Sequence, residues 1–360
     1  MKHTTKLLCG LLAAVMLMSV LLTGCSMPKP TLPGMGNVAA TYGDQEISTG
    51  EYLAYLYLNF NDIYQNYYYY EQYGSDPWEQ VDQTTGLPLA EHMTEETKNS
   101  IIRIVALEKI MKDNGLSWLE EDEKQVDEDL ETLQPDAFID LGFNNDNFIK
   151  AYKNMMLTEY SAFIGLYGKG GVNEVKESEV RKYFDKNYLS YKMITVSLTD
   201  SNGKALSDKE QKAKMEQLEG YLKIYNEKGF EKAMDAYNKD NATDGSKVEA
   251  SKDEDNRYDV DGTELDSATA DAVRSVDIGK AKIVKYGGED KKNPTTASLI
   301  VRLDINKPKT LFDDYYETIL YTLKGEDFDK EVDKVIEGVS VEFKDKVVKK
   351  CDPKKFAETY

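Results

Sequence analysis

The sequence predicts an α+β protein, with mostly helical segments at both ends of the chain and a compact α+β domain inserted between them. Residues 44–188 carry apolar residues at helical spacing almost throughout, and the pattern becomes β-rich at Tyr191. Helical spacing returns over residues 312–336, ahead of one final β-rich stretch. The length of 360 residues is enough for two domains.

The first residues have the features of an export signal. Lys2 and Lys6 give a positive start, and the apolar run Leu7–Leu22 is shorter than the ~20 residues that span a bilayer as a helix. The run ends in a Thr-Gly-Cys sequence at Cys25, which resembles the signal of a bacterial lipoprotein, whose cysteine is acylated. We therefore predict a signal over 1–24 and a lipid anchor at Cys25 on the extracytoplasmic face of the cell membrane. The alternative is an ordinary signal peptide with a chance cysteine.

Residues 25–36 are rich in proline and glycine, which is typical of a tether. The segment 38–43 predicts a strand that ends in a turn. Ser48 or Thr49 then caps a helix that has Glu51 in its first turn.

Tyrosines crowd this first helix. They outnumber the positions of one buried stripe, so we expect some of them to be exposed. Exposed tyrosine offers apolar area with a polar tip, which suits contact with unfolded chains. Packing against the neighbouring helices is the alternative. The candidate polypeptide-binding residues are Tyr52, Tyr55, Tyr64, Tyr67 and Tyr68.

Further helices complete a predicted helical domain over residues 37–188. Their apolar spacing predicts helices at 94–114, 120–131, 148–163 and 175–188. The helix at 120–131 is strongly acidic, and we interpret its charge as a solvated face rather than a metal site.

Residues 189–305 predict the compact α+β domain, and residues 306–360 form the C-terminal segment. The domain contains a strand at 191–198, a turn at 200–203, helices at 207–227 and from 230, a polar loop at 241–264, a helix at 266–275, and strands at 281–286 and 297–305. The C-terminal segment predicts helices at 312–323 and 328–336 and a strand at 339–343.

Composition excludes several classes of function. With 45 Lys plus Arg against 65 Asp plus Glu, the net charge is −20, which argues against a nucleic-acid partner. His3 and His92 are the only histidines, and export removes the first, so mechanisms that need paired histidines are excluded. Motifs of the G-x-S-x-G, H-E-x-x-H, C-x-x-C and P-loop types are absent, and we predict no cofactor and no metal. Cys351 is left as a lone thiol, either incidental or a redox residue.

The order of these parts resembles the PrsA/SurA group of exported foldases, in which a helical chaperone domain is interrupted by a parvulin-type peptidyl-prolyl isomerase domain. The resemblance covers nearly the whole mature chain. It rests on Val38-Ala39, Tyr42-Gly43, Ile47-Ser48, Glu51-Tyr52, Gly115-Leu116, Glu120-Glu121, Val175, Glu177, Glu179-Val180, Tyr183-Phe184, Phe230, Tyr237, Asp240, Val276, Gly279 and Lys280-Ala281.

The resemblance has specific implications. The last strand, residues 339–343, is expected to return and pair near the first. Parvulins carry one histidine in the first strand and one in the last, and here these positions are Met193 and Leu299. Neither side chain can form a useful hydrogen bond. We therefore expect no catalytic residues and a degenerate isomerase domain that binds peptide without strong isomerase activity. A homodimer with a shared crevice is also known from the group, and no residue of this sequence supports it.

The leading hypothesis is a membrane-anchored foldase or chaperone that binds unfolded or newly exported polypeptides. One alternative keeps this architecture as an active peptidyl-prolyl cis-trans isomerase. A second alternative is a ligand-binding lipoprotein of a transporter, which predicts two lobes with parallel strands.

Overall fold

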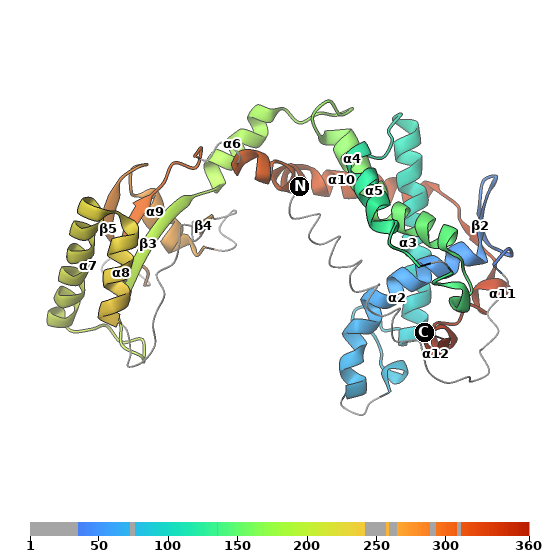
Figure 1. The fold of residues 1–360 in the computed structure, drawn as a ribbon, viewed down its shortest axis with the longest axis horizontal. Helices are drawn as coiled ribbons and strands as arrows, with labels where there is room; N and C mark the ends of the chain where they lie inside the picture. The colour runs from blue at the N-terminus through green and yellow to red at the C-terminus, as the bar shows by residue number, and fades with distance from the viewer. Residues whose placement is uncertain are drawn as a thin grey trace. The chain divides into compact units, whose positions relative to one another are not determined.

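The computed structural model describes residues 35–72, 76–134, 136–241, 257–258, 265–288, 293–307 and 311–359. The predicted signal, the predicted anchor residue Cys25, most of the predicted tether and most of the loop 241–264 lie outside these residues. Within the described ranges, none of the helices has the length and apolar character needed to cross a membrane. The chain divides into two compact units (Figure 1). The helical unit ends at Val175 and resumes at Leu320, and the sheet unit is Lys176–Ile319.

A three-stranded sheet of order β2-β1-β7 joins the two ends of the chain in the helical unit. β1 (Val38–Tyr42) and β2 (Gln45–Ser48) form a hairpin, and β7 (Glu342–Phe343) pairs antiparallel with β1. The predicted return of the last strand to the first is confirmed, although β7 is shorter than expected. β2 was not predicted, because three of its four residues are polar.

Helices make up the rest of the helical unit. They are α2 (Thr49–Gln72), η2 (Pro77–Glu79), α3 (Leu89–Asp113), α4 (Glu120–Leu130), η3 (Ile139–Leu141), α5 (Asn145–Tyr167), the C-terminal part of α10 (Leu311–Gly338), α11 (Asp345–Val348) and α12 (Pro353–Thr359). α3 begins five residues before the predicted start, directly after Pro88, because proline lacks an N–H and is tolerated where a helix starts. Gly115, at φ 65°, follows its end as predicted.

α10 is one continuous helix, so the prediction of two helices at 312–323 and 328–336 is wrong. Gly325 lies inside the helix, where glycine costs about 1 kcal/mol relative to alanine. Fully buried apolar side chains on both sides of it, Leu320 and Phe328 among them, hold the helix against its neighbours. Burial of side chains of this size contributes about 1.5–3 kcal/mol each, which outweighs the cost of the glycine.

Aromatic rings fill the core of the helical unit. Phe138 and Phe148 stack with their ring centroids 4.4 Å apart, and Tyr57 packs edge-on against Phe138 at 5.3 Å. Phe356 of α12 reaches the same cluster, with its centroid 5.6 Å from that of Phe60. The C-terminal segment therefore closes this core as well as the small sheet.

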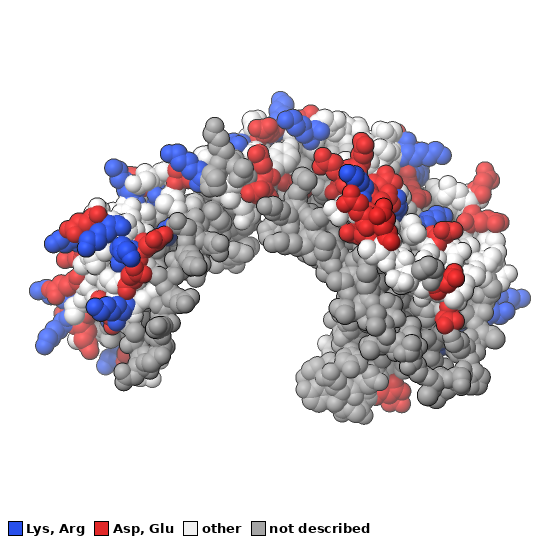
Figure 2. Space-filling view, in the orientation of Figure 1, with Lys and Arg blue, Asp and Glu red and all other residues white. Residues whose placement is uncertain are grey.

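α4 presents a charged surface to solvent. Its buried residues are Val126 and Leu130, whereas its first turn consists of four carboxylates. Acidic side chains gather over this helix in Figure 2. The part of the chain that the structure describes holds no group of three or more His, Cys, Asp or Glu side chains placed to bind a metal. The exposed side chains of Glu120 and Glu121 agree with the interpretation of α4 as a solvated face.

The sheet unit is built on a four-stranded antiparallel sheet of order β4-β3-β6-β5. Its elements are α6 (Glu177–Asn187), β3 (Ser190–Ser197), α7 (Asp208–Lys228), α8 (Phe230–Asn241), β4 (Arg257–Tyr258), α9 (Ser267–Arg274), β5 (Ala281–Tyr286) and β6 (Thr296–Arg302). The strand pairs described in both units are all antiparallel, which contradicts the parallel lobes of the transporter-lipoprotein alternative. Long helices together with two small sheets confirm the predicted α+β class.

The sheet separates two small cores, because successive side chains of a strand point to opposite faces. On one face, Ile194, Val196 and Leu299 pack with residues of α7 and α8. On the other face, Tyr191 and Ile300 pack with residues of α9. We call these the α7–α8 face and the α9 face.

The division between the units differs from the predicted domain limits at 188/189 and 305/306. It falls at 175/176 and 319/320, so that α6 and the start of α10 belong with the sheet unit. Rings account for this grouping. Phe184 of α6 lies 5.0 Å from Tyr188 and 5.4 Å from Phe312, centroid to centroid.

Candidate functional site

Met193 and Leu299, the positions assigned to the missing histidines, lie on opposite faces of the sheet. In the register of β3 and β6, Met193 stands opposite Ile300, and Leu299 stands opposite Ile194. Directly opposed residues share a face, so Met193 belongs to the α9 face and Leu299 to the α7–α8 face. The two positions therefore do not face each other across the sheet. The residues of β6 on the face of Met193 are Thr296, Ser298, Ile300 and Arg302.

A chain of three hydroxyl groups occupies the α9 face instead. The Ser298 Oγ lies 2.9 Å from the Thr195 Oγ1 and 2.9 Å from the hydroxyl oxygen of Tyr286. Ser298 is fully buried, and Thr195 is exposed. Sequence reasoning missed this chain, although counting alternate residues back from Ile300 would have placed Ser298 on the face of Met193. Since the sheet unit contains no histidine, these hydroxyls can donate and accept hydrogen bonds but have no imidazole base to activate them.

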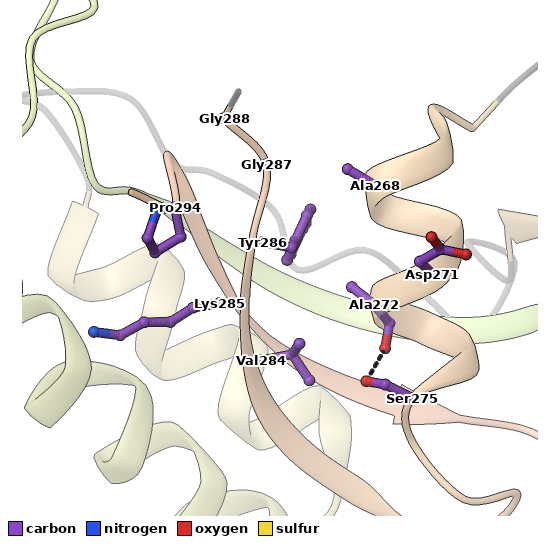
Figure 3. A pocket seen from close by; sticks show the side chains of 10 residues that line it. All are labelled: Ala268, Asp271, Ala272, Ser275, Val284, Lys285, Tyr286, Gly287, Gly288 and Pro294. Atoms are coloured by element: carbon purple, nitrogen blue, oxygen red, sulfur yellow. Dashed lines mark hydrogen bonds between the residues drawn. The ribbon is translucent and has the colours of Figure 1, made fainter. Parts of the chain in front are cut away.

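Next to Tyr286, a pocket of about 440 Å³ opens between α9 and β5 (Figure 3). Its lining comprises Ala268, Asp271, Ala272, Ser275, Val284, Lys285, Tyr286, Gly287, Gly288 and Pro294. Figure 3 shows Val284 and Tyr286 pointing toward α9 and Lys285 pointing to the other side of the strand. The small side chains of Ala268 and Ala272 leave the space between helix and strand open. The pocket therefore has apolar and aromatic walls with single charged groups around them.

Two glycines shape the end of the pocket where β5 stops. Gly287 and Gly288 have φ values of 78° and 84°, which side chains other than glycine rarely adopt. A Cβ atom at Gly288 would lie 2.4 Å from the backbone oxygen of Asn293. Gly288 therefore cannot be replaced by a larger residue without a shift of the backbone beside the pocket.

α9 is fixed by a side-chain cap at Asp266. Its Oδ1 accepts a hydrogen bond from the Thr269 N–H at 3.0 Å, and its Oδ2 accepts one from the Thr269 hydroxyl at 2.6 Å. These bonds favour the ionised carboxylate and lower the pKa of Asp266. At the other end of α9, Ser275 Oγ donates to the Ala272 carbonyl at 2.6 Å (Figure 3). Both ends of the helix that forms one wall of the pocket are thus held in place.

The structure buries two of the tyrosines assigned to polypeptide binding. Tyr52 is 0 % exposed and Tyr55 is 2 % exposed, so neither ring is available on the surface of the helical unit. For these two residues the packing alternative holds, because α2 lies between the hairpin and the other helices and buries more than one stripe. The side chains of Tyr64, Tyr67 and Tyr68 lie outside the described residues, and so does Cys25.

Tyr55 borders a second pocket, of about 470 Å³, within the helical unit. Its hydroxyl accepts a hydrogen bond from Asn154 Nδ2 at 2.9 Å, and burial raises its pKa. The buried carboxylate of Glu51 accepts from Lys150 Nζ at 2.9 Å, and burial raises the pKa of Glu108 nearby. These polar contacts link α2 to α5.

Cys351 is also buried. Its Sγ lies 3.6 Å from the Val347 carbonyl oxygen, and burial raises its pKa to about 12. A thiol in this state is not ionised at neutral pH, which favours the incidental role over the redox one.

No family model matches the chain, and no curated protein matches it. Among solved structures, the chain is similar to the crystal structure of a foldase protein (PrsA) from Lactococcus lactis. That similarity has a TM-score of 0.34 and 11% sequence identity, and it covers 90% of this chain and 99% of the other.

Proposed function

We propose that the protein is a membrane-anchored foldase or chaperone that binds unfolded or newly exported polypeptides on the extracytoplasmic side. The observation that carries the proposal is the pairing of β7 with β1. The sequence resemblance to exported foldases implies the same return of the last strand to the first. This pairing makes one helical unit from both ends of the chain and leaves the sheet unit as an insertion.

The pocket between α9 and β5 supports a binding role for the sheet unit. Its apolar walls and few charged groups suit weak contact with many different sequences. Its neighbouring hydroxyl chain lacks the imidazole groups expected in a parvulin-type site. We therefore propose binding of polypeptide without strong isomerase activity.

Aggregation of an exported protein tests the proposal. Reduced lysozyme is diluted from denaturant with and without the purified protein, and light scattering is followed. We expect suppressed scattering at near-stoichiometric amounts, and no suppression by ribonuclease A at the same concentration. Equal scattering with the protein and with ribonuclease A would contradict a chaperone function.

Residual isomerase activity is the second candidate, and the hydroxyl chain of Thr195, Ser298 and Tyr286 favours it. Proline isomerisation needs positioning and desolvation rather than bond making, so hydroxyl donors beside a peptide could lower the barrier of ~20 kcal/mol. Cis/trans exchange of a proline peptide, measured with wild type and with Ser298→Ala, separates the two candidates. Acceleration that the substitution removes would favour the enzyme.

The lipid anchor is proposed separately at Cys25. Acylation there would place the wild-type protein in the detergent phase of a membrane extract, since two acyl chains anchor stably. We expect Cys25→Ala to move the protein to the aqueous phase and Cys351→Ala, the matched control, to leave it in the detergent phase. A Cys25→Ala protein that stays in the detergent phase would contradict the anchor.

A further inference from the structure

β5 forms one edge of the four-stranded sheet. The strand order β4-β3-β6-β5 gives it a single neighbour, β6, among the described residues. An edge strand presents unpaired N–H and C=O groups, which another chain can use to add a further strand. The binding properties of this edge depend on which backbone groups of β5 point outward and on the side chains beside them.

The hydrogen bonds at the ends of β6 show which backbone groups of β5 point outward. Arg302 N donates to the Lys280 carbonyl at 3.0 Å, and Leu303 N donates to the Ser190 carbonyl at 2.8 Å. In an antiparallel ladder, hydrogen-bonded pairs alternate along the strands. Even-numbered residues of β5 therefore bond to β6, whereas the backbone groups of Ala281, Ile283 and Lys285 point away from the sheet.

The side chains beside this edge are basic on an acidic protein. Lys280, Lys282 and Lys285 are all exposed, within a chain of net charge −20. Lys282 stands opposite Ile300 and so shares the α9 side with Val284, whereas Lys285 points to the α7–α8 side. Two copies of this edge would bring lysines together, which disfavours pairing of the chain with itself. Carboxylates on an added strand would instead be attracted to it.

The pocket lies on the α9 side of the same edge. Val284 and Tyr286 line it and point toward α9 (Figure 3). Alternate side chains of an added strand would point to this side, where an apolar side chain fits between the strand and Ala268 of α9. Their neighbours would point to the side of Lys285.

We propose that the outer edge of β5 binds an extended polypeptide segment as an additional antiparallel strand, with an apolar side chain in the pocket and carboxylates on the side of Lys285. This inference rests on the proposed function and specifies how a client would bind. The edge would then prefer segments whose side chains alternate, with apolar residues on the α9 side and acidic residues on the side of Lys285.

A labelled peptide tests the edge directly. The probe is a fluorescein-labelled Glu-Val-Glu-Leu-Glu-Val-Glu peptide, and its binding to the full-length protein is followed by fluorescence anisotropy. We expect saturable binding that weakens at high salt, and at least about 10-fold weaker binding of the analogue in which lysine replaces each glutamate. Equal binding of the two peptides, or binding of neither, would overturn the proposal.

N-methylation distinguishes strand addition from simple charge attraction. In an antiparallel pair the peptide residues opposite Lys285 share its side of the sheet and exchange backbone hydrogen bonds with it. We therefore expect N-methyl groups on the glutamates to abolish binding, and N-methyl groups on the valines and leucine to leave it within about 3-fold. Equal effects of the two sets of N-methyl groups would contradict strand addition.

Matched variants of the protein test the same binding site from the other side of the interaction. Lys285→Pro removes the charged side chain and an outward N–H that the β5–β6 ladder does not use, whereas Lys285→Ala removes the charged side chain but keeps the N–H. We expect the proline variant to bind at least about 10-fold more weakly than the alanine variant, with unchanged thermal unfolding of both. Ala268→Trp, which fills the pocket, gives a second route to lost binding. Wild-type affinity in both Lys285→Pro and Ala268→Trp would overturn the proposal.

The two proposals fail in distinguishable ways. If the protein suppresses lysozyme aggregation but does not bind the peptide, the edge proposal is wrong and the chaperone proposal stands. If it binds the peptide but does not suppress aggregation, the edge proposal stands and the chaperone proposal is wrong.

Discussion

The helical unit and the sheet unit solve the problem of burying apolar residues differently. The helical unit gathers residues from both ends of the chain into a large apolar cluster that is rich in aromatic rings. The sheet unit divides its apolar residues between two small clusters, because each strand points its side chains to both faces. The comparison indicates that the helical unit depends on long-range closure by the C-terminus. The sheet unit is simpler, and its edge strand β5 lies beside the pocket lined by α9.

The largest expected effect is on closure of the helical unit. Phe356 is fully buried, and we expect Phe356→Ala to reduce the free energy of unfolding by about 3–5 kcal/mol. Trp78 and Trp118 are the only tryptophans, so tryptophan fluorescence reports on this unit alone. The unfolding transition followed by tryptophan fluorescence should move to lower denaturant concentration. Val81→Ala, at an exposed position of the same unit, should change it by less than about 0.5 kcal/mol. An unshifted fluorescence transition in Phe356→Ala would contradict the claim that the helical unit depends on closure by the C-terminus.

The next effect separates the two faces of the sheet. Leu299 is fully buried on the α7–α8 face, and we expect Leu299→Ala to cost about 2–5 kcal/mol. Met193 is only partly buried, and Met193→Ala should cost about 1 kcal/mol. Far-UV circular dichroism should report both changes, with the tryptophan transition unchanged. A cost for Met193→Ala as large as that for Leu299→Ala would contradict the assignment of faces.

A smaller effect concerns the cap of α9. Loss of the Asp266 cap in Asp266→Ala should cost about 1 kcal/mol at pH 7, whereas Asp266→Asn keeps an acceptor and should cost less. The Thr269 hydrogen bonds lower the pKa of Asp266, so its contribution is present above the unfolded pKa of about 3.9. It is lost as the pH falls through the still lower folded pKa. The free energies of unfolding of wild type and Asp266→Ala in urea should therefore converge as the pH falls below the folded pKa, and a constant difference would contradict the cap.

The smallest effect is on the charged cluster that links α3, α5 and α10. Arg103 donates to Glu159 through two nitrogens, at 2.9 and 2.8 Å, and to Asp329 at 3.2 Å. Arg103→Lys keeps the charge but loses the forked geometry, and should cost about 0.5–1 kcal/mol. Fluorescence-detected unfolding at low salt and at 1 M NaCl checks it. The difference should shrink at high salt, and a salt-independent cost would indicate packing rather than charge.

Local signals in the sequence were enough to predict most of the elements. Ser207 and Glu210 form a capping box where α7 was expected to begin, and the spacing of apolar residues located the helices within a few residues. Local signals did not predict the elements whose structure depends on tertiary packing. The short polar strand β2 is stabilised by pairing with β1, and α10 continues through Gly325 because buried residues flank this glycine.

The candidate site was harder to predict than the fold. The face occupied by Leu299 depends on the register between β3 and β6, which are about a hundred residues apart in the sequence. The pocket is made by small residues such as Ala268 and Ala272, which carry no chemical signature. The crowding of tyrosines in α2 suggested binding, but the structure uses Tyr52 and Tyr55 for packing.

Hydrogen–deuterium exchange of the full-length protein, with and without unfolded reduced lysozyme, tests the central claim most directly. The account predicts that the client slows exchange at residues 281–286 of β5 and leaves the hairpin at residues 38–48 unchanged. Slowed exchange confined to the helical unit, or no change in β5 at saturating client, would contradict it.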